Sequence, residues 1–201
     1  MDLLPDPAQA APWARTLIHT RQSVLPRRLV QPGPDEAQLR ALFEAAAAAP
    51  DHEQRLPWRF VVVPGAQRGR LAEVFAQALL DRDAQATAEQ VAMAREKAHR
   101  APLLMLAIAR LDPSDAEVPP PERWVSLGCA IQNLLLSAHA MGFGAGLTSG
   151  QALRSPRLRE LFALAPPEEQ ACFVNVGTVS ARRPMRSRPD PQRFVSILGP
   201  G

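Results

Sequence analysis

The chain has 201 residues, of which 46% are apolar and 21% are charged, the balance of a globular domain that buries a core without disulfides or metals. No run approaches the ~18 uninterrupted apolar residues of a membrane helix, which excludes a membrane-spanning protein. The net charge is only +3, and the basic residues are spread out rather than gathered in one stripe, so charge gives little support to nucleic-acid binding.

Helices and strands are predicted to alternate along the first third of the chain. Residues 7–20 form a helix, and the loop QPGP follows at 31–34. Asp35 then caps a second helix, with Gln38 three residues later in a capping-box arrangement. The run RFVVV at 59–63 consists of bulky β-forming residues closed by Pro-Gly, which predicts a buried strand.

The middle of the chain continues the alternation. Residues 66–82 and 86–98 are predicted surface helices, and the apolar run at 101–110 is predicted to be a strand. A proline-rich surface loop at 111–122 leads into the next helix, at about 122–141. That helix is apolar nearly all round, which is typical of a helix in the middle of a domain or in a subunit interface.

The last third holds the remaining elements. Residues 142–150 end the apolar helix and include a short strand, and a helix follows from Ser155. Residues 171–180 are a strong strand, and Phe194–Leu198 is a late β-like piece without an obvious neighbour in sequence. About four short strands alternating with helices predict an α+β or mixed α/β fold, as one domain over residues 1–201.

Several chemistries have no support in the sequence. No glycine-rich phosphate fingerprint opens a helix after a strand, and neither a nucleophile elbow nor the spacing of zinc ligands is present. No pair of carboxylates stands out, and tyrosine is absent, which excludes phenolic acid catalysis. We therefore expect no catalytic side chain and no metal.

Three polar segments remain as candidates for a site. Arg21, Gln22 and Ser23 follow the first helix, where a guanidinium and a hydroxyl can bind one anion; the alternative is an ordinary polar helix end. The segment APDHEQRLPWRFVVV at 49–63 places His52 between a helix and a strand, where it either caps the helix end or takes part in a site. The third segment, GLTSG at 146–150, is small and polar beside a buried strand.

Together these segments resemble the FMN-dependent nitroreductase family. Arg-x-Ser after the first helix is followed by a long amphipathic helix that ends in Ala-Pro, and then by Pro-Trp-Arg-Phe-Val-Val-Val. The apolar stretch at 126–146 is similar to the central helix of that family, and FVNVGTV is similar to its last core strand. The APDH motif is similar to a small subgroup of NAD(P)H nitroreductases with shortened chains. The resemblance covers about residues 12–198.

The resemblance implies a nitroreductase-like α+β sandwich, with a mostly antiparallel central sheet flanked by helices, that works as an intertwined homodimer. FMN lies at the dimer interface, and NAD(P)H is the transient electron donor. The C-terminal tail, about 181–201, reaches the partner and adds a strand to its sheet. One of Arg182, Arg183, Arg186 or Arg188 could add a phosphate contact, but the tail has no firm match to the family at these positions. The implied FMN-binding residues are Arg21, Gln22, Ser23, His52, Leu56, Leu147, Thr148 and Ser149.

Two positions depart from the family pattern. Leu56 stands where the family usually has Asn or Gln, so we expect it to pack on FMN and to hydrogen-bond through its backbone only. The subgroup tends to have an aromatic residue and an Arg where this chain has Leu147 and Thr148. Both changes make the pocket less polar. Trp58 is expected to be a core residue that closes the helix–strand corner.

The leading hypothesis is an FMN-dependent oxidoreductase that passes hydride from NAD(P)H to a nitroaromatic, quinone or similar acceptor. A flavin-binding or flavin-scavenging protein without turnover is the alternative, and a basic nucleic-acid-binding module is a third. Cys129 and Cys172, the only cysteines, lie in apolar stretches and are expected to be buried free thiols. Free thiols and the lack of a signal peptide predict a cytoplasmic protein.

Overall fold

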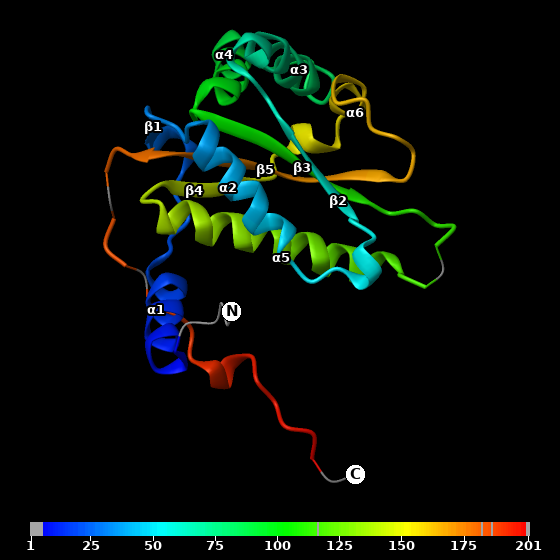
Figure 1. The fold of residues 1–201 in the computed structure, drawn as a ribbon. Coiled ribbons are helices and arrows are strands. Elements are labelled where there is room, and N and C mark those ends of the chain that lie inside the picture. The colour runs from blue at the N-terminus through cyan, green and yellow to red at the C-terminus, as the bar shows by residue number, and fades with distance from the viewer. Residues whose placement is uncertain (1–5, 116, 182, 186, 200–201) are drawn as a thin grey trace.

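The fold is a five-stranded sheet with helices on both faces (Figure 1). The structure is a computed structural model and describes residues 6–115, 117–181, 183–185 and 187–199. Its strands are β1 (Leu29–Val30), β2 (Trp58–Val62), β3 (Leu103–Arg110), β4 (Gly144–Thr148) and β5 (Glu168–Val179). Its helices are α1 (Pro7–Thr20), α2 (Glu36–Ala47), α3 (Arg68–Leu80), α4 (Ala88–Glu96), α5 (Pro120–Ala140) and α6 (Pro156–Leu161).

All strand pairs of the sheet are antiparallel, and β5 is its central strand. β3 pairs with residues 168–176 of β5, and β4 pairs with residues 173–177. Because these stretches overlap, β3 and β4 lie on opposite edges of β5. β2 continues the sheet beyond β3, and the two residues of β1 pair with the end of β5. The predicted antiparallel sheet flanked by helices is confirmed.

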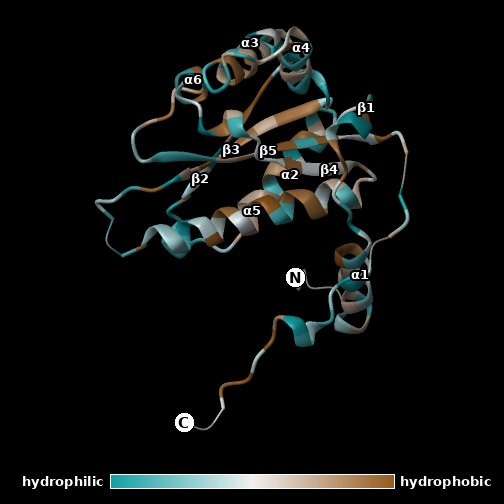
Figure 2. Ribbon diagram, turned by 180° about the vertical axis from the view of Figure 1, so that it is seen from behind, coloured by the Kyte–Doolittle hydropathy of each residue, from teal (hydrophilic) through white to brown (hydrophobic). Residues whose placement is uncertain are grey.

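Strand β3 divides the core into two layers. Its residues 103, 105, 107 and 109 pack with α2 and α5, whereas residues 104, 106 and 108 pack with α3 and α6. Seven of its eight residues are therefore buried, because successive side chains of a strand point to opposite faces. The middle of the sheet is accordingly largely hydrophobic in Figure 2.

Most predicted boundaries agree with the structure. The capping box is present, since Gln38 N–H donates to Asp35 Oδ1 at 2.8 Å and Asp35 N–H donates to Gln38 Oε1 at 3.0 Å. Ser155 caps α6, as expected. Trp58 is buried and begins β2, which confirms its expected place in the core. The sequence pattern missed β1 and the first three residues of β5, because two residues show no periodicity and 168–170 are polar.

Both cysteines are free, as predicted. Cys172 is buried in β5, and burial raises the pKa of its thiol to about 11. Cys129 is only half-buried in α5, so the expectation of full burial is wrong for this residue. The face of α5 that carries Cys129 is only partly covered in the single chain. In the described part of the chain, no helix is long and apolar enough to cross a membrane.

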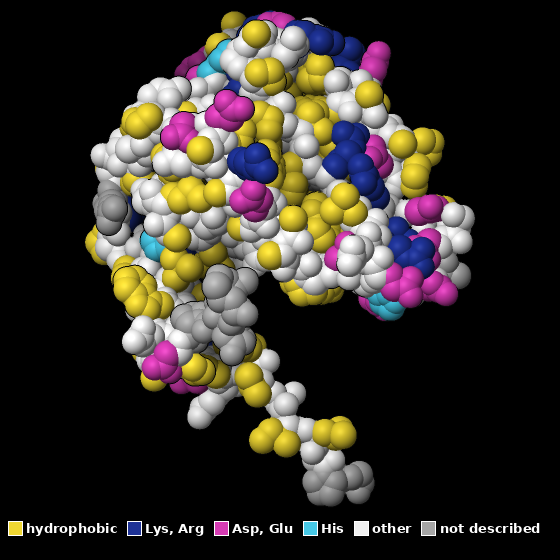
Figure 3. All heavy atoms as spheres, viewed as in Figure 1, with side chains coloured by type: hydrophobic (Ala, Val, Ile, Leu, Met, Phe, Trp, Pro, Cys, Tyr) yellow, Lys and Arg dark blue, Asp and Glu magenta, His cyan; other side chains and the backbone are white. Residues whose placement is uncertain are grey.

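Helix α1 and the last residues of the C-terminal tail (red) extend away from the body of the molecule (Figure 1). α1 has no buried residue, and Trp13 on it is 77% exposed. The predicted β-like piece Phe194–Leu198 has no strand structure here: it follows a 3-10 turn, Pro191–Arg193, and its hydrophobic side chains are exposed (Figure 3). A strand needs a neighbour for its backbone groups, and this chain offers the tail none. Its addition to a partner's sheet stays a prediction.

Basic side chains form no continuous stripe on the face seen in Figure 3. They lie in separate groups, and most of these groups have acidic side chains beside them. Bidentate ion pairs account for part of this mixing, as between Arg95 and Glu73 and between Arg157 and Asp81. This face therefore lacks the concentrated positive potential that attracts a nucleic-acid backbone.

Candidate functional site

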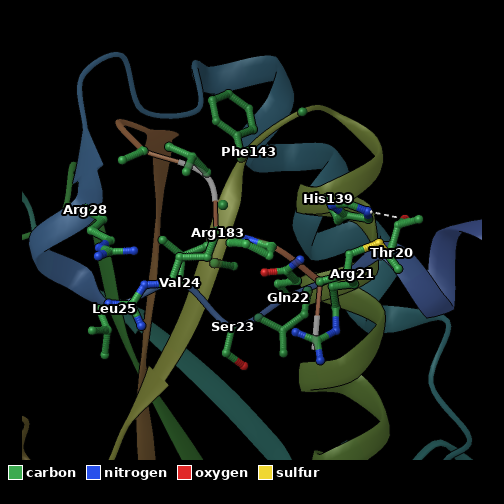
Figure 4. Close-up of a pocket in the computed structure, with 18 of the residues that line it drawn as sticks. Thr20, Arg21, Gln22, Ser23, Val24, Leu25, Arg28, His139, Phe143 and Arg183 are labelled. Atoms are coloured by element: carbon green, nitrogen blue, oxygen red, sulfur yellow. Dashed lines mark hydrogen bonds between the residues drawn. The ribbon is translucent and has the colours of Figure 1, made fainter. Parts of the chain in front are cut away.

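A cavity of about 530 Å³ lies where the chain leaves α1 and passes along β4 (Figure 4). Its walls come from the segment after α1, the C-terminal end of α5, the start of β4 and the tail. Polar or charged side chains that line it are His19, Thr20, Arg21, Gln22, Ser23, Arg28, His139, Arg183 and Arg188. The predicted segment Arg21-Gln22-Ser23 is thus part of the wall of a real cavity.

The edge of β4 holds this segment in place. Ser23 forms a parallel bridge with Ala145, and Val24 N–H donates to Ala145 O at 2.9 Å. A Cβ at position 146 would clash sterically with Val24 O. Glycine at 146 therefore permits the close approach of the two backbones, and this approach aims the three polar residues at the cavity.

The cavity is electropositive. Arg188 Nη2 donates to Arg21 O at 2.6 Å and to His19 O at 3.1 Å, which fixes the tail against the end of α1. Burial, and then the positive charge of Arg188, lower the pKa of Arg21. No acidic side chain is among the described residues that line the cavity. Such a set of unneutralised guanidinium groups is suited to bind a phosphate or another anion.

A contact between α1 and α5 fixes one side of the cavity. Thr20 Oγ1 and His139 Nε2 lie 2.8 Å apart (Figure 4), at hydrogen-bonding distance. Thr20 Oγ1 also donates to Thr16 O at 2.7 Å. The last turn of α1 is therefore attached to the last turn of α5. This attachment orients Arg21, the next residue of the chain.

His52 and Leu56 lie far from this cavity. His52 follows α2 in a short 3-10 turn, and its Nδ1 is 4.0 Å from Glu122 Oε2, near the first turn of α5. His139 lies in the last turn of the same helix, and a rise of about 1.5 Å per residue separates the two ends by roughly 25 Å. A single chain therefore does not bring His52 and Leu56 together with Arg21.

The corner that carries Leu56 has an unusual backbone. Glu53, Gln54 and Leu56 all have positive φ, at 50°, 57° and 48°. Leu56 N–H donates to Asp51 Oδ2 at 2.7 Å, and Arg110 Nη1 lies 3.5 Å from Leu56 O. The backbone of Leu56 is thus engaged within its own chain. Asp51 already accepts the N–H, so a backbone hydrogen bond from Leu56 to FMN would have to use the carbonyl oxygen, and the predicted contact stays a prediction.

Leu147, Thr148 and Ser149 continue β4 beyond the cavity wall. Leu147 is 46% exposed, and Ser149 is exposed as well. Asn175 on β5 fixes the position of Thr148: its Nδ2 donates to Thr148 Oγ1 and to Gly146 O, each at 3.2 Å. The segment is therefore an ordered, partly apolar ledge next to the cavity.

Sequence reasoning missed several cavity residues. Thr20 directly precedes the Arg21–Ser23 segment and Asp51 lies in the APDH motif, but neither carried a predicted role. Arg28 and His139 belong to no motif, and Arg110 frames the Leu56 corner without a local signal. Of the four tail arginines considered for a phosphate contact, Arg183 and Arg188 line the cavity, while 182 and 186 lie outside the described residues. Among those described, no group of three or more His, Cys, Asp or Glu could hold a metal ion.

The chain is similar to known proteins over nearly its whole length. The sequence model of the Nitroreductase family matches residues 18–178. A protein of Haemophilus influenzae named "Putative NAD(P)H nitroreductase" is 34% identical over 186 residues, which are 92% of this chain and 99% of that protein.

Two solved structures have the same fold. The nitroreductase-like family protein from Bacillus cereus superimposes with a TM-score of 0.80 at 19% identity, over 98% of each chain. The FMN-dependent nitroreductase NfnB from Mycobacterium smegmatis, solved in complex with NADPH, superimposes with a TM-score of 0.70 at 19% identity, over 96% of this chain and 100% of that one. The family match, the Haemophilus influenzae relative and the shared fold lead to one conclusion: this chain belongs to the Nitroreductase family.

Proposed function

We propose that this chain is an FMN-dependent oxidoreductase that takes hydride from NAD(P)H and passes electrons to a nitroaromatic, a quinone or a similar small acceptor. The observation that carries the proposal is the arginine-lined cavity along β4. The membership of the chain in the Nitroreductase family supports it, and so do the names of the relatives, one of which is an FMN-dependent enzyme in complex with NADPH.

The cavity fits the phosphate end of FMN. The phosphate carries nearly two negative charges, which Arg21 and Arg188 are placed to neutralise, and Ser23 offers a hydroxyl beside them. Arg28 and Arg183 supply further positive charge along the same wall. Gln22 has an amide that can donate to the polar edge of a flavin ring. The donor set therefore agrees with this cofactor.

When bound, FMN supplies the hydride chemistry, and the protein supplies binding, orientation and electrostatics. This division explains why the described residues form a binding cavity and why the sequence contains no nucleophile motif. The arginines would hold the phosphate, and the exposed ledge Leu147–Ser149 beside the cavity would offer a surface to the flat ring.

A homodimer completes the proposed site. His52 and Leu56 lie at one end of α5 and the cavity at the other, so a second copy placed antiparallel along α5 would bring the His52–Leu56 corner to this cavity. The exposed apolar side chains of α1 and the tail support the same arrangement, since such side chains are typical of an uncovered interface. The tail would then find the strand neighbour that its own chain lacks.

The two free thiols suit a reducing compartment such as the cytoplasm.

The absorbance spectrum of the purified protein tests the proposal. We expect the two visible bands of oxidised flavin, about one FMN per chain, and bleaching of the bands when NADH or NADPH is added without oxygen. Colourless protein that also ignores added FMN would overturn the proposal. Sedimentation analysis of the same sample should give the mass of a dimer, twice 21.9 kDa.

A flavin-binding protein without turnover is the second candidate. It is favoured by the apolar exposed side chains of Leu56 and Leu147, at positions where a polar group would contact flavin or substrate. Stopped-flow mixing with NADH and with NADPH separates the two candidates. A binding protein keeps its flavin oxidised under anaerobic conditions, whereas the oxidoreductase is reduced by at least one of the two donors.

A further inference from the structure

The corner between α2 and β2 is the most strained backbone among the described residues. Of the four residues other than glycine with positive φ, three lie in this one turn, at positions 53, 54 and 56. A leucine rarely adopts this region, and the following residue, Pro57, restricts it further. Strain of this kind persists only where surrounding contacts impose it, and it concentrates at functional sites.

Asp51 imposes the conformation on Leu56. Its Oδ2 accepts the Leu56 N–H at 2.7 Å, while its Oδ1 is buried and has no hydrogen-bond partner. Asp51 as a residue is half-buried, but a buried carboxylate oxygen without a partner is costly enough to call for an explanation. The structure suggests one: Asp51 is needed to hold residue 56 in its turned conformation.

Arg110 and Arg55 secure the corner from the other side. Arg110 Nη1 approaches Leu56 O at 3.5 Å, and Arg110 is itself oriented by Glu168, 3.7 Å from its Nε. Arg55 pairs with Glu53 at 2.8 Å and with Glu117 at 2.7 Å. The turn is thus joined to the proline-rich loop and to the sheet, so it is presented as a rigid unit.

We propose that Asp51 is a positioning residue, which accepts the backbone N–H of Leu56 and holds the leucine side chain outward. Position 56 then presents a hydrocarbon side chain, and no hydrogen bond, to the flavin site of a second copy. Leu56 is 47% exposed although it is a leucine, as this role requires. The inference rests on the proposed function, since it assumes that the corner faces a flavin. It goes further in assigning Leu56 as the residue that makes this edge of the site apolar.

The assignment has a chemical consequence. A hydrogen-bond donor beside the flavin stabilises the extra electron density of the reduced ring, and a hydrocarbon does not. The apolar edge therefore keeps the reduction potential of the bound flavin lower than a donor would. It also favours acceptors with an apolar flank over acceptors that need a hydrogen bond from this side.

Leu56→Asn is the first test, because asparagine tolerates a positive φ and adds an amide donor without disturbing the turn. The flavin-loaded variant should have a more positive midpoint potential than the parent in a spectroelectrochemical titration. Met93→Asn is the matched control: Met93 is also 47% exposed but lies on α4, in the opposite layer, and its replacement should leave the potential unchanged. A potential that is unchanged or lower in Leu56→Asn overturns the assignment.

Asp51→Ala tests the positioning role. Loss of the carboxylate frees the turn, so the Leu56 side chain is no longer held outward for packing. FMN affinity measured by fluorescence quenching should therefore fall by about fivefold, the size of effect expected when one positioning hydrogen bond is lost. Asp51→Asn should restore the affinity, because its amide oxygen still accepts the N–H. Asp83→Ala is the control, since Asp83 Oδ1 also accepts a backbone N–H, from Gln85 at 3.1 Å, in an exposed turn after α3. Parental affinity in Asp51→Ala, or no rescue in Asp51→Asn, overturns the role.

The tests distinguish this inference from the function on which it rests. If the parent protein binds no FMN, the proposed function fails and the inference fails with it. If the parent binds FMN and is reduced by NAD(P)H, but the Leu56 and Asp51 variants behave like the parent, only the inference fails.

Discussion

The guanidinium of Arg188 donates a hydrogen bond to the backbone carbonyl oxygen of Arg21 at 2.6 Å, which joins two residues 167 positions apart in sequence. This contact brings two positive side chains to one wall of the cavity, although like charges repel each other. Burial and the charge of Arg188 lower the pKa of Arg21 as a result. An anion bound between them would relieve the repulsion, and a phosphate is the anion that the proposed cofactor brings.

Arg21→Ala should weaken FMN binding by about 1–3 kcal/mol, because the variant loses a charge-assisted hydrogen bond to the phosphate. Titration calorimetry of the apoprotein with FMN measures the loss. Arg70→Ala is the control, since Arg70 is exposed on α3, in the opposite layer, and its side chain donates a hydrogen bond to the exposed Gln67 at 3.2 Å. Equal affinity in the parent and in Arg21→Ala would remove Arg21 from the phosphate site.

Gly146→Ala should also reduce FMN binding, by a different route. The new methyl group would clash with Val24 O and force the segment 21–24 away from β4, which breaks the Val24–Ala145 hydrogen bond. We expect a lower melting temperature and weaker binding together. In Gly69→Ala the added Cβ meets nothing within 4 Å, so that variant should be as stable as the parent or more stable by about 0.5–1 kcal/mol. Normal FMN affinity in Gly146→Ala would show that the bridge does not position the site.

Val125→Asp should weaken the proposed homodimer. Val125 is 66% exposed on α5 in the single chain, and a carboxylate placed there would have to be desolvated if a second copy covers the helix. Analytical ultracentrifugation should show a shift toward the monomer, with loss of bound FMN. Met93→Asp places the same charge on the opposite layer and should leave the mass unchanged. A stable dimer of Val125→Asp would exclude this face of α5 from the interface.

The ion pair between Glu168 and Arg59 should make stability depend on pH in acid. Arg59 donates to both carboxylate oxygens, at 2.6 and 2.7 Å, and this pairing lowers the pKa of Glu168. A group whose pKa is lower in the folded state stabilises the fold above its ordinary pKa, about 4.3 for Glu. This stability is lost as the pH falls from there through the folded pKa.

Glu168→Gln should therefore lower the free energy of unfolding by about 3 kcal/mol at pH 7, because it leaves Arg59 with an uncompensated charge in a nearly buried site. The difference from the parent should shrink below pH 4. Urea unfolding at pH 7, 5 and 3.5 measures both effects. Glu73→Gln breaks an equally bidentate but exposed pair with Arg95, and it should change little at any of these pH values. A pH-independent loss in Glu168→Gln would assign its effect to packing instead.

Local sequence patterns predicted the long elements because their signals are short-range. The capping box at Asp35 involves residues three positions apart, and the strand β3 was indicated by a continuous run of apolar neighbours. The same patterns placed the Arg21–Ser23 segment at a helix end, where it is found. They failed for β1, which is two residues long, and they leave Phe194–Leu198 open, because its β-forming side chains have no strand to pair with inside the single chain.

The sequence by itself determined the order of helices and strands, the family resemblance and the candidate binding segments, since these depend on residue type and spacing. Only the tertiary structure decided which candidates meet. The sheet places β4 beside the segment after α1, and the tail folds back onto this segment, so Arg21, Arg183 and Arg188 line one cavity. The length of α5 separates this cavity from His52 and Leu56. The tertiary structure also decided that the backbone N–H of Leu56 donates to Asp51. This hydrogen bond depends on a positive φ at residue 56, which the residue types around it do not predict.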